Sequence, residues 1–173
     1  MDHTKLKPGL YVSRVDWFAV PGKHVSLPVT TFDLRMVPPN SEVYSPLPIA
    51  ALHTIEHLGT AFLYDSSQWK DRVICFGPLG SRTGCRLVLA GDLKPQQVVN
   101  PEFRFTTVRE LVVGMCWHIM SYTAKKIPDA TPEECGNYRD HNLLAARQVM
   151  HNYYAILCQT REDLGYDQFT YPK

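Results

Sequence analysis

The stretch from 49 to 63 most restricts how this chain can fold, because its apolar residues recur at the spacing of an α-helix. Pro46 and Pro48 lead into the stretch. Its apolar face is formed by residues three or four positions apart, namely Leu52, Ile55, Gly59 and Phe62. A helix with one apolar face must bury that face against another layer of structure. The sequence therefore predicts a layered protein in which one side of this helix packs inward.

The rest of the chain predicts strands and two longer helices. We expect strands at 11–20, 31–36, 72–76 and 85–90, helices at 108–126 and 142–158, and a short helical turn at 131–134. Strands that pair beside three helices favour an α+β fold, in which an antiparallel sheet packs against a few helices in a two-layer sandwich.

The predicted strand at 31–36 alternates polar and apolar residues. Period-two alternation places Asp33 and Arg35 on one face, while the other face carries Phe32, Leu34 and Met36. Taken from the residues alone, Asp33 and Arg35 are interpreted as a surface ion pair, and His3 as an exposed terminal histidine.

Length and charge exclude several classes of protein. A length of 173 residues predicts one domain over 1–173, with a loosely packed tail at 159–173. The net charge of +1 does not favour a nucleic-acid partner. No apolar run approaches the roughly 18 residues of a membrane helix, and the start lacks the apolar segment of a signal peptide. Five widely spaced cysteines do not form a dense disulfide pattern, so we expect a cytoplasmic protein.

The motif His53-Thr54-Ile55-Glu56-His57 carries the sharpest chemical signal. On a helix, His53 and His57 lie about 40° apart in azimuth, so that their imidazoles can converge on one metal ion. Glu56 lies about 60° from His53 on its other side, where it can act as a base beside the metal. The alternative is a pair of surface histidines, but the neighbouring apolar residues disfavour it.

A tetrahedral catalytic metal needs a third protein ligand and an open position. Five other histidines and five cysteines are available, and position alone does not choose among them. Cys135 follows a turn and precedes a helix. This position fits an accessible thiolate and a structural cysteine equally well. The segment 77–85 holds three glycines and a proline, and predicts either a loop that approaches a ligand or a plain turn between strands.

Together, four motifs resemble those of S-ribosylhomocysteine lyases, the LuxS family. In chain order they are Asp2-His3, Thr31–Arg35, Leu52–Leu58, and Glu134-Cys135-Gly136 followed by His141-Asn142-Leu143. The resemblance implies a homodimeric α+β enzyme with active sites at the dimer interface. Its substrate would be S-ribosylhomocysteine, and its products homocysteine and 4,5-dihydroxy-2,3-pentanedione, the precursor of autoinducer-2.

The resemblance also implies roles for individual residues. His53, His57 and Cys135 match the ligands of one divalent metal per subunit, Fe(II) in the family, which Zn or Co can replace. Glu56 matches the base, while His3 and Arg35 match substrate-binding positions. Asp33 lies on the same strand face as Arg35 and is expected to contribute to substrate binding with His3 and Arg35.

The sequence departs from the family pattern at Ser81, which stands where the family carries a proton-shuttling cysteine. A hydroxyl is a far weaker acid than a thiol, so we expect Ser81 to leave binding intact and to weaken turnover. Cys85 is not expected to replace it. The family also carries residues before the Asp-His pair, so a truncated start is one interpretation. The segment 94–126 looks longer than usual, with added residues near 96–105.

Two other functions remain compatible with these residues. One is a non-catalytic homodimer that binds metal and ligand on the same fold. The other is a metallopeptidase, suggested by the His-x-x-Glu-His pattern alone, with Glu133 or Glu134 as a carboxylate ligand.

Overall fold

The computed structural model describes residues 3–65 and 68–159. The elements follow one another in the order β1 (Gly9–Ala19), β2 (Ser26–Arg35), α1 (Ile49–Asp65), the short 3-10 helix η1 (Lys70–Arg72), β3 (Val73–Pro78), β4 (Gly84–Ala90), α2 (Val108–Ser121) and α3 (Leu143–Cys158). Residues 160–173 of the predicted tail, and Asp2 of the N-terminal motif, lie outside the described residues.

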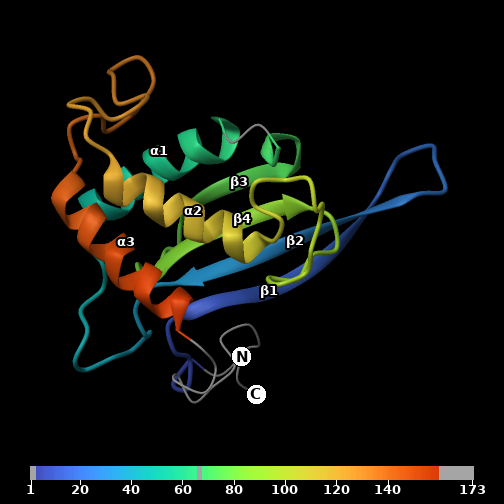
Figure 1. The fold of residues 1–173 in the computed structure, drawn as a ribbon, viewed down its shortest axis with the longest axis horizontal. Helices are drawn as coiled ribbons and strands as arrows, with labels where there is room; N and C mark the ends of the chain where they lie inside the picture. The colour runs from blue at the N-terminus through green and yellow to red at the C-terminus, as the bar shows by residue number, and fades with distance from the viewer. Residues whose placement is uncertain (1–2, 66–67, 160–173) are drawn as a thin grey trace.

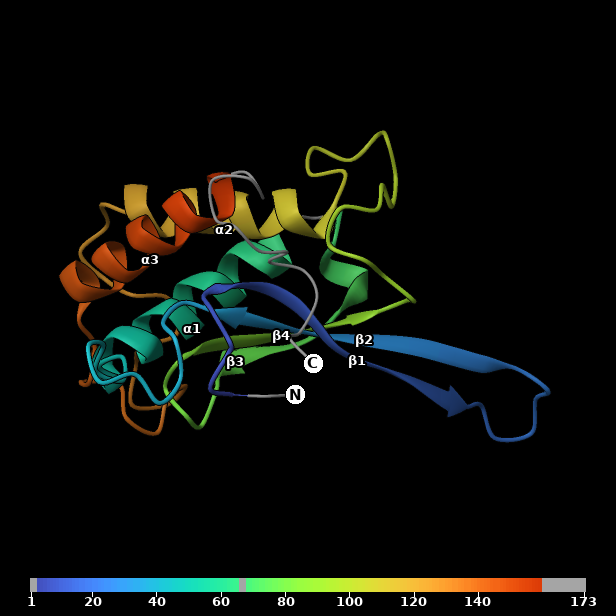
Figure 2. The same cartoon turned by 90° about the horizontal axis from the view of Figure 1, so that it is seen from below.

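The four strands form one antiparallel sheet in the order β1-β2-β4-β3. Figure 2 shows α1, α2 and α3 together on one side of this sheet. The predicted α+β sandwich of an antiparallel sheet and a few helices is therefore confirmed. No described helix combines the length and the apolar character that crossing a membrane requires.

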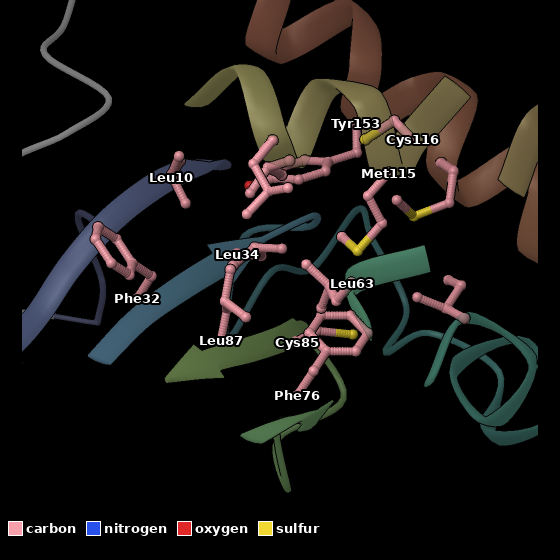
Figure 3. Close-up of a cluster of buried hydrophobic side chains, with 14 of the residues drawn as sticks. Leu10, Phe32, Leu34, Leu63, Phe76, Cys85, Leu87, Met115, Cys116 and Tyr153 are labelled. Atoms are coloured by element: carbon pink, nitrogen blue, oxygen red, sulfur yellow. The ribbon is translucent and has the colours of Figure 1, made fainter. Parts of the chain in front are cut away.

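The core lies between the sheet and the three helices. Figure 3 shows Phe32 and Leu34 of β2, Leu87 of β4 and Met115 of α2 within one cluster of buried side chains. Tyr153 of α3 is also buried there, and its hydroxyl donates a hydrogen bond to the Gly9 carbonyl at 2.9 Å. This bond ties the last helix to the first strand, and Figure 1 shows the end of α3 beside β1.

The polar face of β2 is buried, so the interpretation of Asp33 and Arg35 as a surface ion pair is wrong. Both residues are at most 4% exposed, and their side chains form an ion pair at 2.7 Å. The neighbouring strands place Tyr11 and Arg86 opposite Asp33. A strand pattern cannot show this burial, because alternation separates two faces without saying what covers each.

The β1–β2 hairpin extends beyond the body of the molecule (Figures 1 and 2). Large apolar side chains near its tip are more than half exposed, namely Trp17, Phe18, Val25 and Leu27. Exposed apolar side chains that gather in this way are typical of surfaces that contact other molecules.

Helix α2 ends at Ser121, five residues before the predicted end. Tyr122 has extended backbone angles, and its N–H donates to the Ile119 carbonyl, which caps the last turn. Ile119 is also the last buried residue of the helix, so packing no longer supports a helix beyond this point. The following segment forms turns that lead to Cys135.

Helices α1 and α3 begin and end within two residues of their predicted positions. The buried stripe of α3 consists of Ala146, Met150, Tyr153 and Leu157. Val149 and Ile156 lie at the edge of this stripe, where they are partly buried. The expected added residues near 96–105 form a loop that packs on the core, where the Phe105 carbonyl accepts a hydrogen bond from the Trp69 indole.

Candidate metal centre

Helix α1 carries His53 and His57 one turn apart, and their Nε2 atoms lie 3.1 Å from each other. Backbone carbonyls orient both rings: His53 Nδ1 lies 3.0 Å from the Asp140 carbonyl, and His57 Nδ1 lies 2.7 Å from the Pro128 carbonyl. A carbonyl can only accept, so each Nδ1 donates its proton, and Nε2 of the neutral ring presents a lone pair.

Cys135 brings a sulfur atom to the same point from a distant part of the chain. Its Sγ lies 3.3 Å from His53 Nε2, and it accepts a hydrogen bond from the Asn137 N–H at 3.4 Å. The thiol is positioned by a helical turn in which the Cys135 N–H donates to the Thr131 carbonyl at 2.9 Å. The predicted turn at 131–134 thus fixes the place of the third donor.

The three donor atoms fit a divalent metal ion. Two imidazole lone pairs 3.1 Å apart repel each other unless a cation lies between them. Metal–nitrogen bonds of about 2.0–2.1 Å in a tetrahedron separate neighbouring donors by about 3.3 Å. The 3.1 Å between the two nitrogens is close to that spacing, and the 3.3 Å from Cys135 Sγ to His53 Nε2 is close to the slightly longer spacing that a metal–sulfur bond of about 2.3 Å gives. Nitrogen and thiolate donors suit zinc, iron or cobalt better than magnesium or calcium.

His141 is a fourth residue at this centre, and the sequence did not indicate it as a ligand. A ligand-capable atom of His141 lies within 4.8 Å of those of His53, His57 and Cys135. Its ring stacks on His53 with centroids 4.2 Å apart. Partial burial lowers the pKa of His141, and the neighbouring His53 and His57 lower it further. Its sequence signal is its place in the fourth family motif, six residues after Cys135.

Glu56 links helix α1 to the glycine-containing loop. The Oε1 atom of Glu56 lies 3.1 Å from the point that a Cβ on Gly77 would occupy, so the carboxylate lies against bare backbone. Burial raises the pKa of the Cys85 thiol, and the negative charge of Glu56 raises it further. Cys85 is fully buried in the core and is held as a neutral thiol.

A cavity of about 330 Å³ lies beside this loop. Its walls include three predicted site residues, namely His3, Arg35 and Ser81, together with Cys75, Arg86 and the loop residues 77–80. Asp33 does not line the cavity. It positions two side chains that do line the cavity, because its carboxylate accepts hydrogen bonds from Arg35 at 2.7 Å and from Arg86 at 3.2 Å.

Ser81 is connected to this ion pair by hydrogen bonds. Its Oγ lies 2.9 Å from the Thr83 hydroxyl, which accepts a hydrogen bond from Arg35 Nη1 at 2.8 Å. Gly84 is required next to them, because its φ is +153° and a Cβ there would lie 1.8 Å from the Leu34 carbonyl oxygen. The loop therefore holds Ser81 at the cavity through close contact with β2.

The fold and the donor cluster define an α+β protein with a histidine–cysteine group that could hold a divalent metal ion. The family model described as S-ribosylhomocysteinase (LuxS) matches residues 1–163, and the chain belongs to this family. It is similar to the S-ribosylhomocysteine lyase of Borreliella burgdorferi strain ZS7, with 37% identity over 94% of this chain and 92% of the relative. The lyase of Desulfotalea psychrophila is 38% identical over 99% of this chain and 94% of the relative. The lyase of Clostridium acetobutylicum is 34% identical over 100% of this chain and 95% of the relative.

Proposed function

We propose that this protein is a metal-dependent S-ribosylhomocysteine lyase whose metal is held by His53, His57 and Cys135. The observation that carries the proposal is that His57 Nε2 and Cys135 Sγ approach His53 Nε2 to 3.1 and 3.3 Å, with all three donors within 4.8 Å of one another, in a chain that belongs to the LuxS family. The products would be homocysteine and 4,5-dihydroxy-2,3-pentanedione, the precursor of autoinducer-2.

The bound ion would be Fe(II), with Zn or Co as replacements. When bound, it supplies Lewis acidity to the oxygen of a sugar carbonyl. The thioether of the substrate is on C5 of the ribose, so the carbonyl must migrate from C1 to C3 before elimination. Each migration moves a proton between neighbouring carbons, which requires a base close to the metal.

Glu56 is proposed as this base. It follows His53 by three residues on α1, and its carboxylate lies against Gly77, which lines the cavity. The carboxylate thus lies on the helix that carries His53 and His57 and against a residue that lines the cavity, which supports a role in moving a proton of a substrate bound there.

His3 and Arg35 are proposed to bind substrate in the cavity, with Asp33 holding Arg35. The Nε of Arg35 is buried and has no hydrogen-bond partner among the described residues, although Arg35 lines the cavity. A buried donor without a partner is costly, so a substrate oxygen that accepts from it stabilises the complex.

Ser81 is proposed to occupy the position of the family's catalytic cysteine. Its side chain lines the cavity. Among the described residues its hydroxyl forms a hydrogen bond with the Thr83 hydroxyl and none with a basic side chain. We expect binding to be retained and proton transfer to be slow. Cys85 cannot replace the thiol, because it is buried in the core and held neutral.

The protein is further proposed to be a cytoplasmic homodimer of single-domain chains, with active sites at the interface. The sheet face opposite the helices carries no helix in the described part of the chain (Figure 2), and the β1–β2 hairpin exposes Trp17 and Phe18. Both features support association of two copies through this side.

The test is homocysteine release from S-ribosylhomocysteine, followed with a thiol-reactive chromogen on Co(II)-loaded protein. We expect Ser81→Cys to increase turnover by about 10²–10⁴-fold, the usual contribution of a proton-transfer group, while Ser81→Ala stays as slow as the unchanged protein. If no variant releases thiol although one Co(II) binds per chain, the lyase function is wrong and the alternative, a non-catalytic binder, is favoured.

A further inference from the structure

His141 has an unused nitrogen at the metal centre. The residue precedes α3, and its Nε2 is buried without a hydrogen-bond partner in residues 3–65 and 68–159. Its ring stacks on His53 at 4.2 Å and meets His57 edge-on at 4.9 Å between centroids. A buried polar atom without a partner is rare in proteins and calls for an explanation.

The hydrogen bonds of Thr54 determine which nitrogen of His141 carries the proton. The Thr54 hydroxyl donates to the Ala50 carbonyl at 2.8 Å and accepts from the Asn142 N–H at 2.9 Å. Its single hydrogen is therefore in use when His141 Nδ1 approaches it at 3.3 Å. In this pair Nδ1 must be the donor, so Nε2 of neutral His141 carries a lone pair and acts as an acceptor.

His141 is held less firmly than the two histidines of α1. Carbonyls orient His53 and His57 at 3.0 and 2.7 Å, whereas the one hydrogen bond of His141 within the described residues is the 3.3 Å contact with a hydroxyl. The donors of His53, His57 and Cys135 already show the spacing of bound ligands, and a catalytic metal keeps its fourth position for water or substrate. An oxygen at that position carries hydrogens that need an acceptor.

We propose that His141 Nε2 accepts a hydrogen bond from the O–H or N–H of the molecule that occupies the fourth position, and so orients a hydroxylated substrate there. The proposal rests on the metal-binding part of the proposed function. His141 is thus a substrate-positioning residue beside three metal ligands, and the buried Thr54 sets its tautomer.

The test compares His141→Phe, which keeps an aromatic ring over His53, with His141→Gln, which keeps a side-chain acceptor. Each protein is loaded with Co(II), and its visible spectrum is titrated with acetohydroxamate, which carries hydrogen-bond donors, and with acetate, which carries none. We expect His141→Phe to bind Co(II) with an unchanged spectrum and to lose about tenfold in acetohydroxamate affinity, the effect of one hydrogen bond. Acetate affinity should be unchanged, and His141→Gln should recover part of the loss.

Two results would overturn the proposal. Loss of Co(II) affinity or a changed resting spectrum in His141→Phe would show that His141 is itself a ligand. Equal losses for both probes, or no loss for either, would show that the acceptor is not used. S-ribosylhomocysteine is titrated separately: if it leaves every spectrum unchanged while the two probes still differ, the proposed substrate is wrong and the role of His141 stands.

Discussion

Asp33 is the buried charge on which one wall of the cavity depends. Its side chain is 1% exposed, and its two oxygens accept hydrogen bonds from Arg35 at 2.7 Å and from Arg86 at 3.2 Å. The Arg35 side chain is 5% exposed and the Arg86 side chain is 47% exposed. The two ion pairs therefore share a carboxylate but differ in how much water surrounds the arginine.

We expect Asp33→Asn to destabilise the protein by about 3 kcal/mol, because it leaves the Arg35 charge buried without a counter-charge. Removing one partner of a buried pair costs about 3–5 kcal/mol, and the amide oxygen of Asn retains one acceptor, which favours the lower end. For a chain of this length, about 3 kcal/mol lowers Tm by about 6–12 °C. Arg86→Gln is the matched control and should cost less than about 1 kcal/mol, because that arginine is half in water.

Thermal and urea unfolding followed by circular dichroism measure both variants. The double variant Asp33→Asn/Arg35→Gln should be destabilised by clearly less than the sum of its single changes, because it removes both members of the buried pair. The reasoning is refuted if Asp33→Asn costs no more than Arg86→Gln, or if the two changes at the buried pair are additive.

Two further changes test the packing and the electrostatics of the helical layer. Gly59→Ala should destabilise by about 1–2 kcal/mol in urea unfolding despite the helix preference of alanine, because its Cβ would lie 2.4 Å from Phe76 Cε1; an unchanged or increased midpoint would contradict this close packing. Burial lowers the pKa of His118, against a smaller opposing effect of Asp65, so the unfolded chain binds more protons below its usual pKa of about 6.5. Stability should therefore fall as pH decreases below about 6.5, and His118→Gln should reduce that loss; an unchanged pH dependence would show that His118 is not responsible.

Local sequence patterns anticipated much of this molecule. The spacing of Leu52, Ile55 and Gly59 predicts α1 and its buried face, and the four-residue spacing of His53 and His57 places both imidazoles on one side of that helix. These predictions succeed because a helix repeats every 3.6 residues, so that sequence distance translates directly into spatial distance. The end of α2 was missed because tertiary packing, rather than helix preference, decides where a helix stops.

The third donor could not be chosen from residue spacing. Cys135 is 78 positions after His57, and only the packing of the turn at 131–134 against α1 brings its sulfur to 3.3 Å from His53. The same holds for His141, whose approach to His53 depends on hydrogen bonds between Thr54 of α1 and the start of α3. Resemblance to a family supplied Cys135, while nothing in the sequence distinguished His141 as an acceptor.

The order of residues alone therefore decided most of the elements and the histidine pair, because each depends on neighbours within one or two turns of chain. The tertiary structure decided which donors meet, which charges are buried, and which side chains share the cavity. Asp33 shows the difference most clearly: its pattern is that of an exposed strand face, yet the structure buries it completely between two arginines. Burial and long-range contact depend on what the rest of the chain places beside a residue, and no local period carries that information.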